Sequence, residues 1–171
     1  MTRLLLPLVL IITALSMPKA WAGYLPDNKL TPGVDNPLVT QDNIKSTICV
    51  SGWTKTVRPS TSYTNKIKKQ KMIEQGLQGQ KMSDFELDHD KSIEDGGSPT
   101  DPKNLWNELW YLNINGYDLG AHTKDAAENA TKKAICAGKI TLNEGRNQLA
   151  KDWTVLYLRF VNKQFPKYVD H

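Results

Sequence analysis

Histidine is scarce in this chain, and of its three histidines one follows an aspartate well inside the sequence. The pair is Asp88-His89, and the other histidines are His122 and the last residue, His171. Aspartate offers a hard oxygen ligand for a divalent cation, and imidazole is a base that is neutral near pH 7. Neighbouring side chains on a strand point to opposite faces, but at a strand end both can reach one site. Asp88 and His89 are therefore candidates for a metal ligand and a general base.

A tight loop separates this pair from a second segment that could do chemistry. Gly96-Gly97, Pro99 and Asp101-Pro102 punctuate the chain after His89. They predict a short strand ending near His89, a glycine-rich loop and a second short strand at Asn104-Leu105-Trp106. A buried asparagine beside a tight loop can hold the loop backbone through its amide.

Residues 121–137 are rich in Ala and Lys and predict a helix, which Gly138 can end. His122, Asp125 and Glu128 recur on it at i, i+3 and i+6, so they share one face. This places possible metal ligands on a helix that follows two strands.

This order of strand, loop, strand and helix resembles the HNH nuclease superfamily, also called the ββα-metal or His-Me finger nucleases. Within that superfamily it is similar to a branch of small exported bacterial HNH-like proteins. The resemblance covers about residues 30–153 and is carried by these motifs: Ile48-Cys49-x-x-Gly52, Thr54-x-x-Val57-Arg58-Pro59, Asp88-His89, Gly96-Gly97-x-Pro99, Asn104-Leu105-Trp106, Lys124-Asp125-x-x-Glu128 and Cys136-Ala137-Gly138.

The resemblance implies an α+β fold with a small ββα-metal core, additional helices, a mainly α-helical C-terminal half and one disulfide. By position it implies that His89 is the general base, that Asp88 is a metal ligand and that Asn104 keeps the His89 loop in shape. The last metal ligand stays open: His122 is the chemically obvious choice, and the alternatives are Asn113, Asp125 and Glu128. The expected cofactor is a divalent metal ion, Mg²⁺ first, with Mn²⁺, Ca²⁺ or Zn²⁺ as alternatives.

The distribution of charge is more informative than the net charge of +4. Residues 55–81 are strongly basic and residues 84–101 strongly acidic, which suits a cation held beside a polyanion. We expect nucleic acid, DNA rather than RNA, to be the partner, bound with little sequence specificity. The residues expected to contact phosphate are Lys66, Lys68, Lys69, Lys71 and Lys124.

The remaining elements follow from punctuation and periodicity. Residues 23–43 predict an extended, irregular N-terminal arm, and residues 44–171 the HNH-like domain. Residues 44–57 indicate short β structure or a helical turn, and residues 63–75 a helix ended by Gly76. A Thr141-x-x-Glu144 capping box predicts the start of the last helix. Its apolar residues at helical spacing predict core: Leu149, Trp153, Leu156, Tyr157 and Phe160.

The first residues predict export. Arg3, the apolar run 4–15 and Ala20-Trp21-Ala22 form a signal peptide over residues 1–22, and the run is too short to span a bilayer. We expect no transmembrane segment in the mature chain and a periplasmic or secreted location. The only two cysteines, Cys49 and Cys136, are expected to form a disulfide in an oxidising compartment.

Three functional hypotheses follow. The first is an exported metal-dependent HNH-type endonuclease that hydrolyses phosphodiester bonds. The second is a catalytically inactive HNH-like module that binds nucleic acid or an envelope partner. It is motivated by residues 90–95, which apart from Ile93 are polar where the family often has apolar residues and a proline. The third is a structural domain in which Asp88 and His89 only pair with each other.

Overall fold

An antiparallel pair of short strands lies at the centre of the computed structural model, which describes residues 23–165. β1 (Phe85–His89) pairs with β2 (Leu105–Leu109), and α3 (Ala121–Cys136) follows them in the chain. The order strand, strand, helix agrees with the sequence-based expectation, and the α+β fold class is confirmed. The predicted signal peptide, residues 1–22, and His171 lie outside the described residues.

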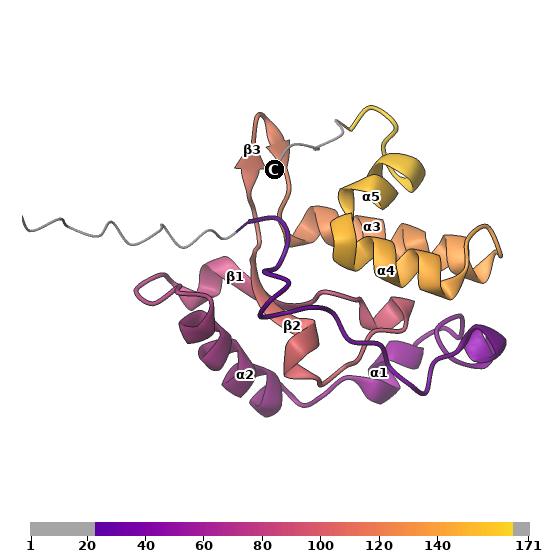
Figure 1. The fold of residues 1–171 in the computed structure, drawn as a ribbon, viewed down its shortest axis with the longest axis horizontal. Coiled ribbons are helices and arrows are strands. Elements are labelled where there is room, and N and C mark those ends of the chain that lie inside the picture. The colour runs from indigo at the N-terminus through magenta and orange to yellow at the C-terminus, as the bar shows by residue number, and fades with distance from the viewer. Residues whose placement is uncertain (1–22, 166–171) are drawn as a thin grey trace, which may run out of the picture.

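Helices pack on both sides of this strand pair. Figure 1 shows α2 (Thr61–Glu74) on one side, and α3, α4 (Leu142–Asp152) and α5 (Thr154–Phe160) packed together on the other. The smaller elements are η1 (Gln41–Ser46), α1 (Trp53–Val57), η2 (Met82–Asp84), η3 (Ile93–Asp95), η4 (Pro102–Asn104), β3 (Asn113–Ile114) and β4 (Tyr117–Asp118). Within the described range, none of the helices is both long and apolar enough to cross a membrane.

The ends of several helices are set by the residues that the sequence indicated. Residues 44–57, for which β structure or a helical turn was expected, form helical turns within η1 and α1. α2 ends just before Gly76, whose φ of 68° is readily adopted by glycine. At the start of α4, the Thr141 hydroxyl accepts from Glu144 N at 3.1 Å, and the Glu144 carboxylate accepts from Thr141 N at 2.7 Å. The predicted capping box is therefore present.

The predicted last helix is divided into α4 and α5 at Trp153. The Asp152 carboxylate accepts from Thr154 N at 3.0 Å and also from its hydroxyl, a local side-chain contact that competes with the helical pattern. Of the apolar residues predicted as core, Leu149, Trp153 and Leu156 are buried, and Tyr157 and Phe160 are partly buried against them.

The N-terminal arm lies along the loop between β1 and β2. Asn36 N donates to Gly96 O at 2.9 Å, and Ser98 N donates to Val34 O at 2.7 Å. The Asp35 carboxylate adds ion pairs with Lys91 at 2.9 Å and, from α4, with Arg146 at 3.1 Å. The arm therefore fixes the outer side of this loop against the body of the protein.

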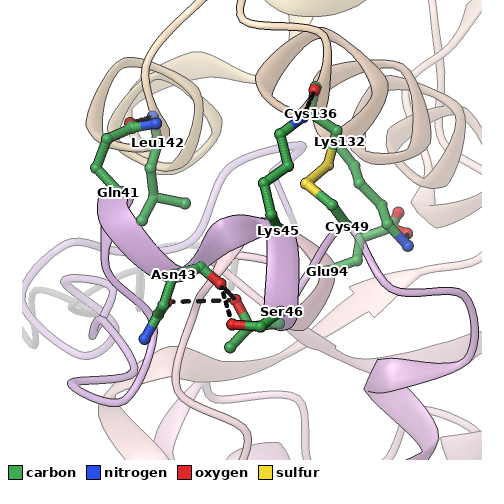
Figure 2. The surroundings of a disulfide bond; sticks show 10 residues. Gln41, Asn43, Lys45, Ser46, Cys49, Glu94, Lys132, Cys136 and Leu142 are labelled. Carbon is green, nitrogen blue, oxygen red and sulfur yellow. Dashed lines mark hydrogen bonds and ion pairs between the residues drawn. A yellow bond between two sulfur atoms is a disulfide. The ribbon is translucent and has the colours of Figure 1, made fainter.

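The predicted disulfide between Cys49 and Cys136 is confirmed. Figure 2 shows that it joins the segment after η1 to the last residue of α3. The Lys45 ammonium donates to the carbonyl of Cys136 beside it, and Gln41 Oε1 accepts from Leu142 N at 2.7 Å. The bond and these contacts attach the η1 region to the ends of α3 and α4, next to a buried cluster that includes Ile48 and Ile135.

We expect the Cys49→Ser/Cys136→Ser double variant to lose about 2–4 kcal/mol of unfolding free energy, because an intact bond restricts the unfolded chain. The bond closes a loop with a sequence separation of 87, which places it among the more effective cross-links in that view. Urea unfolding monitored by tryptophan fluorescence measures the change. Reduction of the wild-type protein should produce the same loss, and equal midpoints for oxidised wild type and double variant would contradict the expectation.

Candidate functional site

His89 is the last residue of β1 and is held in one orientation. Its ring is largely buried, and Nε2 lies 3.2 Å from the carbonyl oxygen of Pro99. Burial lowers the pKa of His89 to about 4, so the imidazole is neutral at pH 7. A hydrogen on Nε2 that is donated to Pro99 leaves the Nδ1 lone pair available as a base. The position combines a fixed ring with the protonation state that a general base needs.

Asn104 holds the loop that carries Pro99. Its side-chain oxygen accepts from Lys91 N at 2.9 Å and Val34 N at 3.1 Å, and its nitrogen donates to Lys91 O at 2.9 Å and Ser98 O at 2.8 Å. All four hydrogen bonds of the buried amide are thus made to backbone groups. The site therefore depends on Asn104 for the shape of the loop, as the sequence suggested for this residue.

Gly97 shows why the loop needs a glycine pair. A Cβ atom at this position would lie only 1.7 Å from Lys91 O, and Gly97 N donates to Ser92 O at 2.8 Å. The two limbs of the loop therefore touch through backbone atoms alone.

Asp88 does not face an open position beside His89, because the Lys124 ammonium lies against it. Lys124 Nζ is 2.5 Å from Asp88 Oδ2, contacts the Glu128 carboxylate and donates to the backbone oxygen of His89 at 2.9 Å. Lys124 is only 1 % exposed. Burial alone would raise the pKa of Asp88, but the ammonium lowers it to about 2. The pKa of Lys124 is raised well above its usual value, since the carboxylates outweigh the effect of burial.

Further carboxyl groups surround this ion pair. Glu108 on β2 is buried near Asp88, and burial raises its pKa well above the usual range. Asp90 and Asp95 are also buried, and within the described part of the chain no hydrogen bond reaches their side-chain oxygens. Burial raises the pKa of Asp90 to about 7 and that of Asp95 well above its usual value. The site therefore carries much less negative charge than its acidic composition suggests.

An arginine that the sequence-based list omitted lies beside this site. Burial has the largest effect on the pKa values of His89, Glu86 and Asp125. The positive charge of the exposed Arg58 guanidinium makes a smaller contribution and lowers all three pKa values. Arg58 follows α1 directly, and in the sequence it belonged to the Thr54-x-x-Val57-Arg58-Pro59 motif and to the strongly basic residues 55–81. It is an exposed cation placed to meet an anionic ligand near His89.

The predicted helical metal ligands are not brought together. His122 is exposed and its ring stacks 5.0 Å from that of Trp110, while the exposed Asn113 uses its side-chain oxygen to accept from Gly116 N at 3.1 Å. Asp125 is partly buried near Asp88, and Glu128 binds Lys124. Over residues 23–165 no three His, Cys, Asp or Glu side chains are grouped so that they could hold one metal ion. The residues present do not fit the expected divalent metal in this arrangement.

The predicted phosphate-binding lysines divide into two groups. Lys66 and Lys69 are exposed on α2. Lys68 donates to Phe85 O, Lys71 is buried and pairs with Glu74 at 3.0 Å, and Lys124 is buried as described. Of these five lysines, Lys66 and Lys69 are thus the two that present exposed ammonium groups to a polyanion.

Comparisons with models of protein families, with curated proteins and with solved structures yield no match to this chain. The likeness to HNH nucleases therefore stays a prediction that depends on the motifs and on the geometry described above.

We expect Asn104→Asp to lower the unfolding free energy by about 2–4 kcal/mol, since it turns a carboxylate oxygen toward the carbonyls of Lys91 and Ser98. The change keeps the shape of the side chain and removes its two donors. Chemical denaturation at pH 7 measures the loss. The exposed Asn129→Asp serves as the matched control and should change stability little. Equal losses in the two variants would contradict the role given to Asn104.

Stability should fall as the pH rises from about 4.5 to 7. A buried carboxyl with a raised pKa binds its proton in the folded state after the unfolded chain has released it, so rising pH favours unfolding. The pKa values of Glu86 and Asp90 both reach about 7, against about 4 in the unfolded chain. The lowered pKa of His89 acts in the opposite direction between about 4 and 6.5, so this one histidine offsets only part of the effect of the carboxyls.

Denaturation curves across this pH range measure the slope. Asp90→Asn should flatten it by up to about 1.4 kcal/mol per pH unit, the contribution of one proton, because burial raises the pKa of this carboxyl to about 7. A wild-type slope of zero or of opposite sign between about pH 4.5 and 7 would contradict the expected protonation of these groups.

Proposed function

We propose that this protein is a nuclease, a phosphodiester hydrolase in which His89 is the general base. The observation that supports this most directly is the state of His89: neutral, fixed by the Pro99 carbonyl and left with a free Nδ1 lone pair. The loop bound by Asn104 and the order β1, β2, α3 provide the frame, in agreement with the resemblance to HNH nucleases.

In the proposed reaction, Nδ1 of His89 takes a proton from water as the water oxygen attacks phosphorus. The phosphorus–oxygen bond to the leaving group then breaks, and the released oxygen takes a proton from solvent. A base with a pKa near 4 is mostly in its proton-accepting form at neutral pH. The chain's own residues thus supply the proton transfer that hydrolysis requires.

Binding of the substrate depends on cations at the surface. The Arg58 guanidinium, near His89, can form paired hydrogen bonds with phosphate oxygens. Lys66 and Lys69 on α2 offer additional contacts that do not read sequence. Protons held on the buried carboxyls reduce repulsion toward a polyanion. We therefore propose nucleic acid, DNA in preference to RNA, as the substrate.

A second candidate is a module on the same frame that binds nucleic acid without cleaving it. The observation in its favour is the Lys124 ammonium, which takes the oxygens of Asp88 and Glu128 that a metal-dependent nuclease would use. Salt-sensitive binding without any cleavage would support this candidate over the first. The export predicted from residues 1–22 is compatible with either.

We expect His89→Gln to slow cleavage by about 10²–10⁴-fold while nucleic-acid affinity stays nearly unchanged, because only the proton transfer is lost. Plasmid nicking, followed with EDTA and with Mg²⁺ and Mn²⁺, measures the rate. His122→Gln is the matched control, since this exposed histidine stacks on Trp110 and should leave the rate unchanged. Equal rates for His89→Gln and wild type would show that His89 is not the base.

Arg58→Gln should instead weaken binding and reduce the slope of log affinity against log salt by about one. The cause is the loss of one phosphate contact. Lys132→Gln is the control, because Lys132 pairs with Glu94 at 3.6 Å and is not expected to bind phosphate. A salt slope that is equal in the two variants would remove Arg58 from the binding surface.

A further inference from the structure

The Lys124 ammonium is bonded to oxygen atoms that are also good ligands for a divalent ion. Its three contacts are one carboxylate oxygen each from Asp88 and Glu128 and the backbone oxygen of His89. Carboxylate and carbonyl oxygens are what Mg²⁺ and Ca²⁺ prefer. A protonated ammonium has three hydrogens, so these contacts use all of them.

We infer that Lys124 is the resident cation of this site: its ammonium occupies the position between Asp88 and Glu128 that a divalent ion would need, and wild-type protein binds none there. The inference deepens the proposed function. One consequence, that cleavage needs no divalent cation, rests on the proposed nuclease function. The binding statement itself follows from the contacts of Lys124.

Connectivity favours the ammonium over an ion from solution. Lys124 and Glu128 are four residues apart on α3, so the ammonium is delivered to the Glu128 carboxylate by the helix itself. An ion from solution would compete with a group that is already held there at high effective concentration. It would also leave the Lys124 cation displaced within a buried environment.

The surrounding carboxyls show what removal of the ammonium would create. Asp88, Glu128 and Glu108 are all buried, and each of them raises the pKa of Lys124. Without Lys124 these groups would surround an uncompensated position with several oxygen atoms. A purely structural ion pair predicts that loss of Lys124 only destabilises the fold. A resident cation predicts in addition that a divalent ion can replace it.

The test compares three proteins: the wild-type mature protein, Lys124→Ala and Lys124→Ala/Asp88→Asn. Each is measured with and without about 1 mM MnCl₂. Electron paramagnetic resonance measures bound Mn²⁺, and thermal unfolding measures its effect on stability. We expect no Asp88-dependent Mn²⁺ binding by wild type. The melting temperature of Lys124→Ala should rise by about 5 °C or more with Mn²⁺. The double variant should not respond.

Two results would overturn the inference. One is Mn²⁺ binding by wild type that disappears in Asp88→Asn, and the other is folded Lys124→Ala that binds no Mn²⁺. If Lys124→Ala does not fold, Lys124→Met keeps most of the aliphatic stem and is tested in its place. Asp88-dependent Mn²⁺ binding by wild type would overturn the inference whether or not either variant folds. Neither readout involves cleavage, so an inactive wild-type protein would refute the proposed nuclease without affecting this result.

Discussion

The ion pairs of Lys124 connect the two parts of the molecule on which the site depends. They join Asp88 at the end of β1 to Glu128 in the middle of α3, and they also fix the backbone oxygen of His89. A buried charge is tolerated only where opposite charges and hydrogen bonds compensate it. The same ammonium therefore fixes the backbone at His89 and neutralises the carboxylate that Glu128 places on α3.

The other contacts near His89 hold the loop rather than the charges. Asn104 bonds both limbs of the loop, and the N-terminal arm adds hydrogen bonds at Gly96 and Ser98. The disulfide attaches the η1 region, which follows the arm, to the end of α3. A small protein with short strands has few backbone hydrogen bonds between strands to fix such a loop. The Asn104 amide, the N-terminal arm and the disulfide fix it instead.

The sequence was most informative where local chemistry decides structure. Glycine punctuation, the Thr141 capping box and the pair of cysteines predicted the end of the first strand, a helix start and a disulfide, and the structure confirms all three. The second strand, predicted at residues 104–106, instead extends over Leu105–Leu109. It was least informative where three-dimensional proximity decides. His122 has the right chemistry for a metal ligand and a helical position near Asp125, but it stacks on Trp110 instead. Arg58 and Asp88 are 30 positions apart in the sequence, so nothing local could place them at one site.

Lys124 shows the limit of such inference most clearly. A lysine in a helix beside Asp125 is usually a solvated surface residue, and the basic character of the chain made phosphate binding a reasonable expectation. Burial reverses this interpretation. The enclosed ammonium forms ion pairs with Asp88 and Glu128, so it is not accessible to a ligand. The exposed Arg58 is then the cation that a phosphate can reach. In the proposed site, the residue that organises the carboxylates and the residue proposed to meet the substrate are therefore two different cations, one fixed inside the fold and one at its surface.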